Sequence, residues 1–106
     1  MNRTVNKVIL VGNAGSDPDV RITANGDRKA AVSLATTTRE NSEERTDWHR
    51  VILCGRRAQF AEDYVSRGDK LFVEGSIQYG SYERDGILIP TTEIRASEIV
   101  LLTPAR

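Results

Sequence analysis

Residues 47–54 carry the hydrophobic and polar pattern around which the rest of the chain is organised. Read as a β-strand, they divide into two faces, because successive side chains of a strand point to opposite sides. One face receives Trp48, Arg50, Ile52 and Cys54, and the other receives Asp47, His49, Val51 and Leu53. The strand is therefore expected to present a large aromatic ring and a guanidinium group on the same face.

Two strands are predicted before this one. Residues 5–11 form a β-rich run that ends among the glycines of residues 12–15, which suggest a bulge or a sharp bend. Residues 20–23 alternate again and are expected to continue the first strand. Asn25–Gly26 is the strongest short hairpin signal in the chain, and it leads into a second strand over residues 29–38. One face of that second strand carries a run of small side chains that a ligand could approach closely, namely Ala31, Ser33, Ala35 and Thr37.

A charged loop and a helix are predicted on either side of the central strand. Residues 39–46 are rich in charged and small polar side chains and are expected to form the loop. Gly55 closes the central strand, and apolar residues spaced for one helix face predict a helix of about three turns over residues 56–66. Gly68 is expected to end this helix.

Two long strands are predicted in the last third of the chain. Residues 70–79 alternate as a fourth strand, residues 80–86 form a polar hairpin loop, and residues 87–102 form a fifth strand. Pro90 within the fifth strand implies an edge position or a bulge. Three strands, one helix and two strands in this order predict an all-β domain with one helix between strands three and four. This is a five-stranded Greek-key barrel of the OB-fold type.

Length and composition fit one soluble domain that spans residues 1–106. The single cysteine excludes an internal disulfide and fits a reducing compartment. No apolar run approaches the roughly 20 residues that a membrane-spanning helix needs, and the first residues lack the apolar core of a signal peptide. We therefore expect a cytoplasmic protein that does not associate with membranes.

The net charge of zero, fifteen basic against fifteen acidic residues, does not by itself indicate a nucleic-acid-binding protein. Twelve of the fifteen cations are arginines, which suit phosphate groups and aromatic faces better than lysines do. Trp48 beside Arg50 offers a stacking platform and a charge partner for a base and its phosphate. For this strand alone, a core tryptophan next to a solvated arginine is an equally good interpretation.

A set of motifs along the chain resembles the bacterial single-stranded DNA-binding protein family. The motifs are residues 5–13 (VNKVILVGN), 15–21 (GSDPDVR), 25–26 (NG), 34–36 (LAT), 46–53 (TDWHRVIL) and 68–75 (GDKLFVEG), followed by Tyr82. They occur in the family's order and spacing and cover nearly the whole chain. Each motif is weak alone, but the ordered set is highly specific.

The resemblance implies a barrel whose groove binds single-stranded DNA without reading its sequence and protects it during replication, repair and recombination. In such grooves, bases stack on aromatic rings and phosphates meet cations. By position, Trp48 matches the family's stacking tryptophan of the third strand. Tyr82 falls where the family usually has another tryptophan, and Tyr79 is a further stacking candidate.

Two positions depart from the family's pattern and remove stacking surface. Cys54 stands where the family commonly has a phenylalanine that packs on bases, and residues 37–39 stand where it has a tryptophan after the second strand. A stacked base contributes about 1–3 kcal/mol. The resemblance therefore implies a lower affinity unless Tyr79 or arginines compensate.

Several cations are candidates for contacts with the DNA backbone. Arg50 has the strongest position, because strand parity places it beside Trp48. The others are Arg3, Lys7, Arg21, Arg39, Arg56 and Arg84. Arg39 belongs to the predicted charged loop, where glutamates dilute its charge. For any single arginine, a solvated surface charge is the alternative.

The resemblance also implies an assembly and partners. His49, on the face opposite Trp48, matches a position that contacts another subunit in the family, commonly in a homotetramer. The alternative is a half-buried strand histidine with no special role. The family usually carries a long tail with an acidic tip that recruits replication and repair enzymes at the bacterial nucleoid. The sequence ends at residues 103–106 without such a tail, so this recruitment stays open for the chain.

The residues predict no catalytic set, no cofactor and no metal site. His49 and Cys54 lie on opposite faces of one strand and cannot form a nucleophile–base pair there. One cysteine and one histidine cannot make an ordinary structural zinc site. The alternatives are an OB-fold accessory protein of the primosome or an OB module that binds structured RNA and, more remotely, a metal-dependent OB-fold nuclease.

Overall fold

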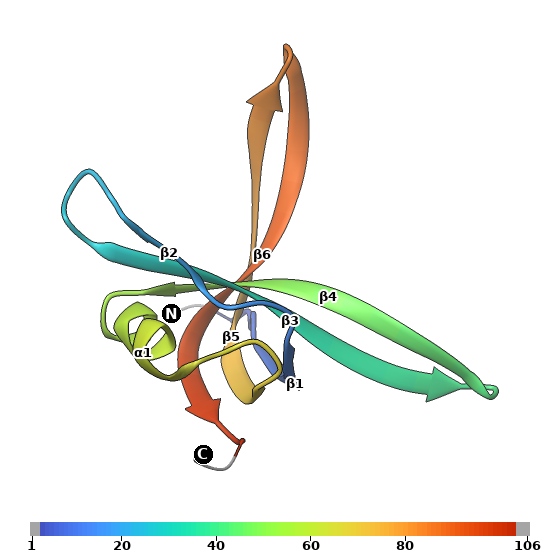
Figure 1. Ribbon diagram of the computed structural model, residues 1–106. Coiled ribbons are helices and arrows are strands. Elements are labelled where there is room, and N and C mark those ends of the chain that lie inside the picture. Colours follow the sequence, from blue (N-terminus) through green and yellow to red (C-terminus); the bar gives the residue numbers. More distant parts are fainter. Residues whose placement is uncertain (1–2, 104–106) are drawn as a thin grey trace.

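The alternating segments of the sequence form strands in the computed structural model, which describes residues 3–103. In chain order the elements are β1 (Val8–Ala14), β2 (Asp19–Ile22), β3 (Arg28–Glu40), β4 (Glu43–Cys54), α1 (Arg56–Tyr64), β5 (Lys70–Arg84) and β6 (Ile87–Leu101). Neighbouring strands follow the order β1-β5-β6-β4-β3-β2, and a further pairing of β1 with β3 closes the sheet into a barrel (Figure 1).

β1 and β2 act together as one interrupted strand of this barrel. Both pair antiparallel with β3, β1 through Ala14 opposite Leu34 and β2 through Asp19 opposite Ala31. β4 and β6 run parallel where they meet, and the other strand pairs are antiparallel. The predicted five-stranded Greek-key barrel of the OB-fold type, with its helix between the third and fourth strands, is thereby confirmed.

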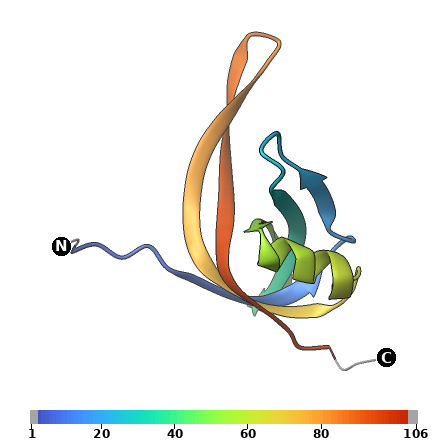
Figure 2. The same ribbon diagram turned by 90° about the vertical axis from the view of Figure 1, so that its left-hand side faces the viewer.

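Alternate side chains of β3, β4 and β5 fill the barrel, as their period-2 pattern requires. The largest fully buried side chains are Val32, Leu34, Val51, Leu53, Leu71 and Val73. Helix α1 packs beside the strands (Figure 2) through Ala58 and Ala61, whose small side chains permit a close approach. Burying a large aliphatic side chain stabilises the fold by about 1.5–3 kcal/mol, so this interior holds the strands that carry the exposed site.

Three β-hairpins extend beyond the barrel as arms (Figure 1). The β2–β3 hairpin turns at the predicted Asn25–Gly26, where Gly26 has a φ of 85°. The loop predicted over residues 39–46 is wrong, because β3 and β4 continue through it as a hairpin. Their turn is Asn41–Ser42, with φ values of 50° and 68°, and positive φ at both central residues suits a two-residue hairpin turn.

The hairpin predicted at residues 80–86 is present, but its loop is shorter than predicted. β5 and β6 stay paired up to Arg84 opposite Ile87, and the turn is Asp85–Gly86, with φ values of 53° and 78°. Pro90 lies within this arm, where the other side of β6 has no partner strand, since β4 pairs with β6 only at residues 94 and 95. The edge position implied by this proline is therefore confirmed.

Two predicted boundaries shift for local reasons. β1 begins at Val8 rather than at residue 5, and the Asn6 side chain continues its pairing by exchanging two hydrogen bonds with the Ile77 backbone, at 2.8 and 2.9 Å. Helix α1 ends at Tyr64 rather than at residue 66, because Val65 is already extended, so Gly68 is not its stop. Gly68 instead serves the turn that follows, with a φ of 90°. No helix in residues 3–103 is long and apolar enough to cross a membrane.

Candidate nucleic-acid interface

Trp48 is exposed on the outside of the barrel, with 62% of its surface accessible. The core interpretation of this tryptophan is therefore wrong. Its ring lies against the backbone of Gly15, where a Cβ atom would fall 2.4 Å from the ring carbon Cζ3. Ala35 is its partner across the β3–β4 pairing. Gly15 has no side chain and Ala35 has a small one, so these neighbours leave the ring open to solvent.

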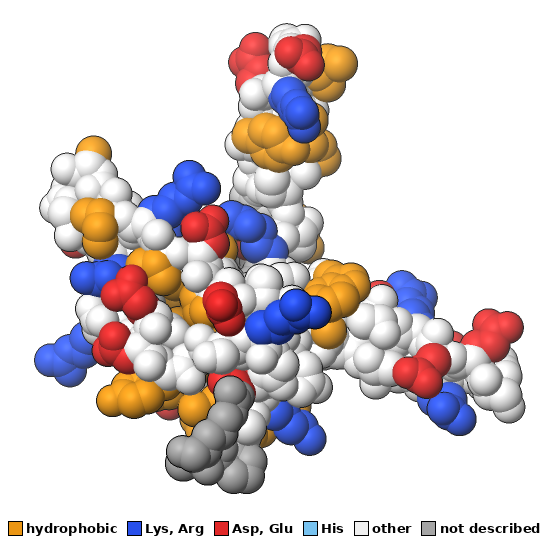
Figure 3. All heavy atoms as spheres, in the orientation of Figure 1, with side chains coloured by type: hydrophobic (Ala, Val, Ile, Leu, Met, Phe, Trp, Pro, Cys, Tyr) orange, Lys and Arg blue, Asp and Glu red, His pale blue; other side chains and the backbone are white. Residues whose placement is uncertain are grey.

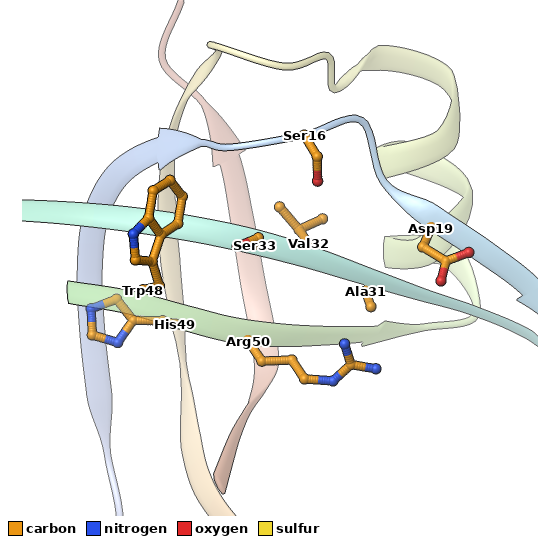
Figure 4. A pocket seen from close by; sticks show the side chains of 8 residues that line it. All are labelled: Ser16, Asp19, Ala31, Val32, Ser33, Trp48, His49 and Arg50. Atoms are coloured by element: carbon orange, nitrogen blue, oxygen red, sulfur yellow. The ribbon is translucent and has the colours of Figure 1, made fainter. Parts of the chain in front are cut away.

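A hollow of about 240 Å³ lies beside this ring (Figure 4), and it adjoins a second hollow of about 320 Å³. We call the two hollows together the Trp48 groove. Asp19, Ala31 and Arg50 line both hollows, so they are continuous. The remaining lining residues are Ser16, Arg21, Lys29, Val32, Ser33, Trp48, His49 and Ile52. Ala31 and Ser33 belong to the small-residue face predicted for the second strand, which therefore does line a concave surface.

The groove carries three exposed cations, Arg21, Lys29 and Arg50. Arg21 pairs with Asp19 at 3.5 Å, and Arg50 Nε donates to a Glu93 carboxylate oxygen at 2.8 Å. Exposed ion pairs of this kind contribute little to stability, so a polyanion can compete for both arginines. Lys29 was missed by the sequence analysis, although it precedes Ala31 on the same face of β3.

The other predicted cations are spread over the molecule rather than gathered at the groove (Figure 3). Arg39 lies in the β3–β4 arm and pairs with Glu44 at 3.3 Å, and Arg84 lies near the tip of the β5–β6 arm. Lys7 precedes β1 and pairs with Glu74 at 3.7 Å. Arg56 begins α1 beside a hollow with Phe60 and Ile99, and exposed Arg3 precedes β1. Any ligand that met all of them would have to follow the surface over a long path.

Tyr79 and Tyr82 are exposed on the β5–β6 arm, with 78% and 48% of their surfaces accessible. Their spacing of three places them on opposite faces of β5. Ile87 and Leu88 are also exposed, in the opposite strand of the arm, on the side of Tyr82 that leads to the tip. The two faces of the arm therefore each carry an exposed aromatic ring. On the face of the molecule drawn in Figure 3, hydrophobic side chains form an orange band on the upright arm.

His49 and Cys54 occupy the separate positions that strand parity predicts. The His49 ring is half-buried at the edge of the groove, and its Nε2 lies 2.8 Å from the Thr36 hydroxyl. Cys54 is exposed at the end of β4, opposite Lys29. Within residues 3–103, no group of three or more His, Cys, Asp or Glu side chains is placed to hold a metal ion.

A second surface lies on the outside of β1, β5 and β6. Strand register places Val11, Phe72 and Val100 in one row, in which Val11 and Val100 are exposed and Phe72 is half-buried. Exposed Ile9 adjoins this row, opposite Glu74. We call Ile9, Val11, Phe72 and Val100 the β1 apolar row.

Residues 5–102 match the model of a family described as "Single-strand binding protein family". A single-stranded DNA-binding protein of Xanthomonas campestris pv. campestris is 44% identical over 108 residues, covering 96% of this chain and 63% of the relative. One of Xylella fastidiosa is 43% identical, covering 96% and 66%. The chain thus spans somewhat less than two thirds of the length of these relatives. A solved structure described as "Plasmodium falciparum SSB complex with ssDNA" superposes with a TM-score of 0.85 at 30% identity, covering 97% of this chain and all of the other.

Proposed function

The chain belongs to the single-strand binding protein family, and from this membership we propose that it binds single-stranded DNA in the Trp48 groove without reading its sequence. The observation that carries the proposal is the exposed Trp48 ring above a groove of small side chains and cations. Every base has a flat face, so stacking on an exposed ring tolerates any sequence. The groove has room for a DNA strand because the small side chains of Ala31 and Ser33 project little from β3.

The DNA backbone is proposed to run from Trp48 past Arg50 toward Arg21 and Lys29, which are the cations of the groove. The remaining predicted contacts, Arg3, Lys7, Arg39, Arg56 and Arg84, would act outside the groove on a strand that wraps around the molecule. Tyr82 and Tyr79 would stack bases along the β5–β6 arm, on its two faces. Phosphate contacts of this kind release counterions, so binding weakens as salt rises.

We propose assembly into a homotetramer through the β1 apolar row and the surface near His49. Exposed apolar side chains in a contiguous row favour burial against another subunit. The edge of β1 from Val8 to Gly12 has no pairing with β3, so it offers unpaired backbone groups to a second copy.

The proposed role is passive and non-enzymatic. Bound single strands are kept from re-pairing and shielded from nucleases during replication, repair and recombination. We propose the same location and partners as for the family. The location is the cytoplasm at the bacterial nucleoid, and the partners are the replication and repair enzymes that act on the same strands.

The test uses Trp48 as its own reporter, since it is the only tryptophan in the chain. Oligo-dT is titrated against tryptophan fluorescence at low and high salt, with duplex DNA, tRNA and a gel-shift assay in parallel. We expect strong quenching by oligo-dT, little by duplex, and weaker binding at high salt. Binding in the gel shift without quenching would move the site away from Trp48. A preference for tRNA would favour the RNA-binding alternative, and magnesium-dependent cleavage of the oligonucleotide would favour a nuclease.

A further inference from the structure

Arg50 lies where the two hollows of the Trp48 groove meet, and its guanidinium is already paired. Its Nε donates to Glu93 Oε2 at 2.8 Å. The arginine side chain is 61% exposed and the glutamate 31%, so the acid is the more buried partner. A guanidinium has five N–H donors and this hydrogen bond uses one. The pair therefore leaves Arg50 able to bind a phosphate while a carboxylate offsets its charge.

The barrel topology fixes the position of Glu93 beside the groove. Glu93 lies opposite Gln78 and directly before Ile94, where β6 begins its short parallel pairing with β4 at Val51. It is thus at the base of the β5–β6 arm, on the strand next to the one that carries Trp48 and Arg50. A phosphate that reached Arg50 would lie near this carboxylate.

We propose that Glu93 competes with nucleic-acid phosphates for Arg50 and thereby sets the affinity and the salt dependence of the groove. The inference rests on the proposed function, because it concerns the phosphate backbone of the DNA strand whose bases are proposed to stack on Trp48. An incoming phosphate must displace the Glu93 carboxylate or share the guanidinium with it, and two anions beside one cation repel each other. Since Glu93 offsets the charge of Arg50 before binding, Arg50 contributes little to counterion release.

The matched pair of variants is Glu93→Gln and Glu62→Gln. Glu62 pairs with Arg28 at the same 2.8 Å, and its side chain is 40% exposed. Its partner Arg28 lines neither hollow of the groove, whereas Arg50, the partner of Glu93, lines both. Both substitutions preserve side-chain shape and raise the net charge by one, so a general charge effect is shared. Thermal melts establish that each variant is folded. Oligo-dT affinity is then measured at about 50 and about 200 mM salt, a range in which phosphate contacts weaken markedly.

We expect E93Q to bind oligo-dT more tightly than the wild type and E62Q at low salt. One further phosphate neutralised makes the slope of log affinity against log salt more negative by about 0.7, so E93Q should lose about 2.6-fold more affinity over the fourfold rise in salt. E62Q should keep the wild-type slope.

Two results would overturn the inference and leave the proposed function intact. In the first, the wild type binds and E93Q merely follows E62Q. In the second, E93Q binds more weakly than the wild type, which would make Glu93 a residue that positions Arg50. If neither the wild type nor the variants bind oligo-dT at about 50 mM salt, the inference and the proposed function fail together.

Discussion

The angle of the exposed Trp48 ring depends on a glycine in a neighbouring segment of the chain. Gly15 follows β1 and lies directly against the indole ring, close enough that any Cβ atom would overlap it. Most tryptophans are largely buried, and here the ring stays outside because β4 turns it away from the core. Gly15 then decides the angle at which the ring meets the groove.

Gly15→Ala is expected to tilt the Trp48 ring away from its position. The added methyl group would lie 2.4 Å from Cζ3, so the ring must move. Tryptophan emission should change, and oligo-dT binding should weaken by up to the about 1–3 kcal/mol that one stacked base contributes. Gly80→Ala is the control, because its methyl group meets only the flexible Thr91 hydroxyl, at 3.1 Å. Unchanged emission in Gly15→Ala would show that the ring is not held by this contact.

Strand parity predicts residues that share a face, but it does not predict contacts between strands. It placed Trp48 and Arg50 together correctly, because a strand alternates whatever its neighbours are. It gave no sign of the partner of Arg50, since Glu93 lies 43 positions away and only the barrel brings it near. Strand parity could also have predicted Lys29 as a cation of the groove, because it lies on the same face of β3 as Ala31 and Ser33.

At the scale of elements, the barrel was predictable from the sequence and the length of the arms was not. The core strands carry a clear alternation of buried and exposed residues, which is the signal that a strand pattern needs. The arms are exposed on both faces, so residues 39–46 and 80–86 look like polar loops. Asp85–Gly86 is a dipeptide typical of tight hairpin turns and could have revealed the length of the β5–β6 arm.

Ser42→Gly is expected to stabilise the β3–β4 arm. Ser42 has a φ of 68°, a conformation that costs a residue with a Cβ about 1–2 kcal/mol and that glycine adopts readily. Part of this gain is offset by the greater freedom of glycine in the unfolded chain. The measurement is amide hydrogen exchange of the arm, where protection should increase. Ser81→Gly, within β5 and opposite Pro90, is the same change in an extended strand and should reduce protection in its own arm. Equal loss of protection in both variants would contradict the turn assignment.

At the scale of the whole molecule, the cations are dispersed, and six of those in residues 3–103 are paired with nearby acids. Ion pairs hold Lys7, Arg21, Arg28, Arg39, Arg45 and Arg50. The chain therefore has no strong positive field to attract DNA from a distance, in keeping with its net charge of zero. Affinity must come from local contacts along the groove and the arms, and several copies in one assembly would multiply such contacts on a single strand.

A molecule that acts through many local contacts gains from assembly, and the β1 apolar row is the surface proposed for this assembly. Val11 is 46% exposed at the β1 end of this row, and Val11→Lys places a charge where a subunit contact would bury it. We expect the variant to elute as a smaller species than the wild type in size-exclusion chromatography with light scattering. Ile22→Lys is the control, because Ile22 is comparably exposed but lies on β2, away from the row. A folded Val11→Lys variant with the mass of the wild-type assembly would place the subunit contact elsewhere, and His49 would then be the next surface to test.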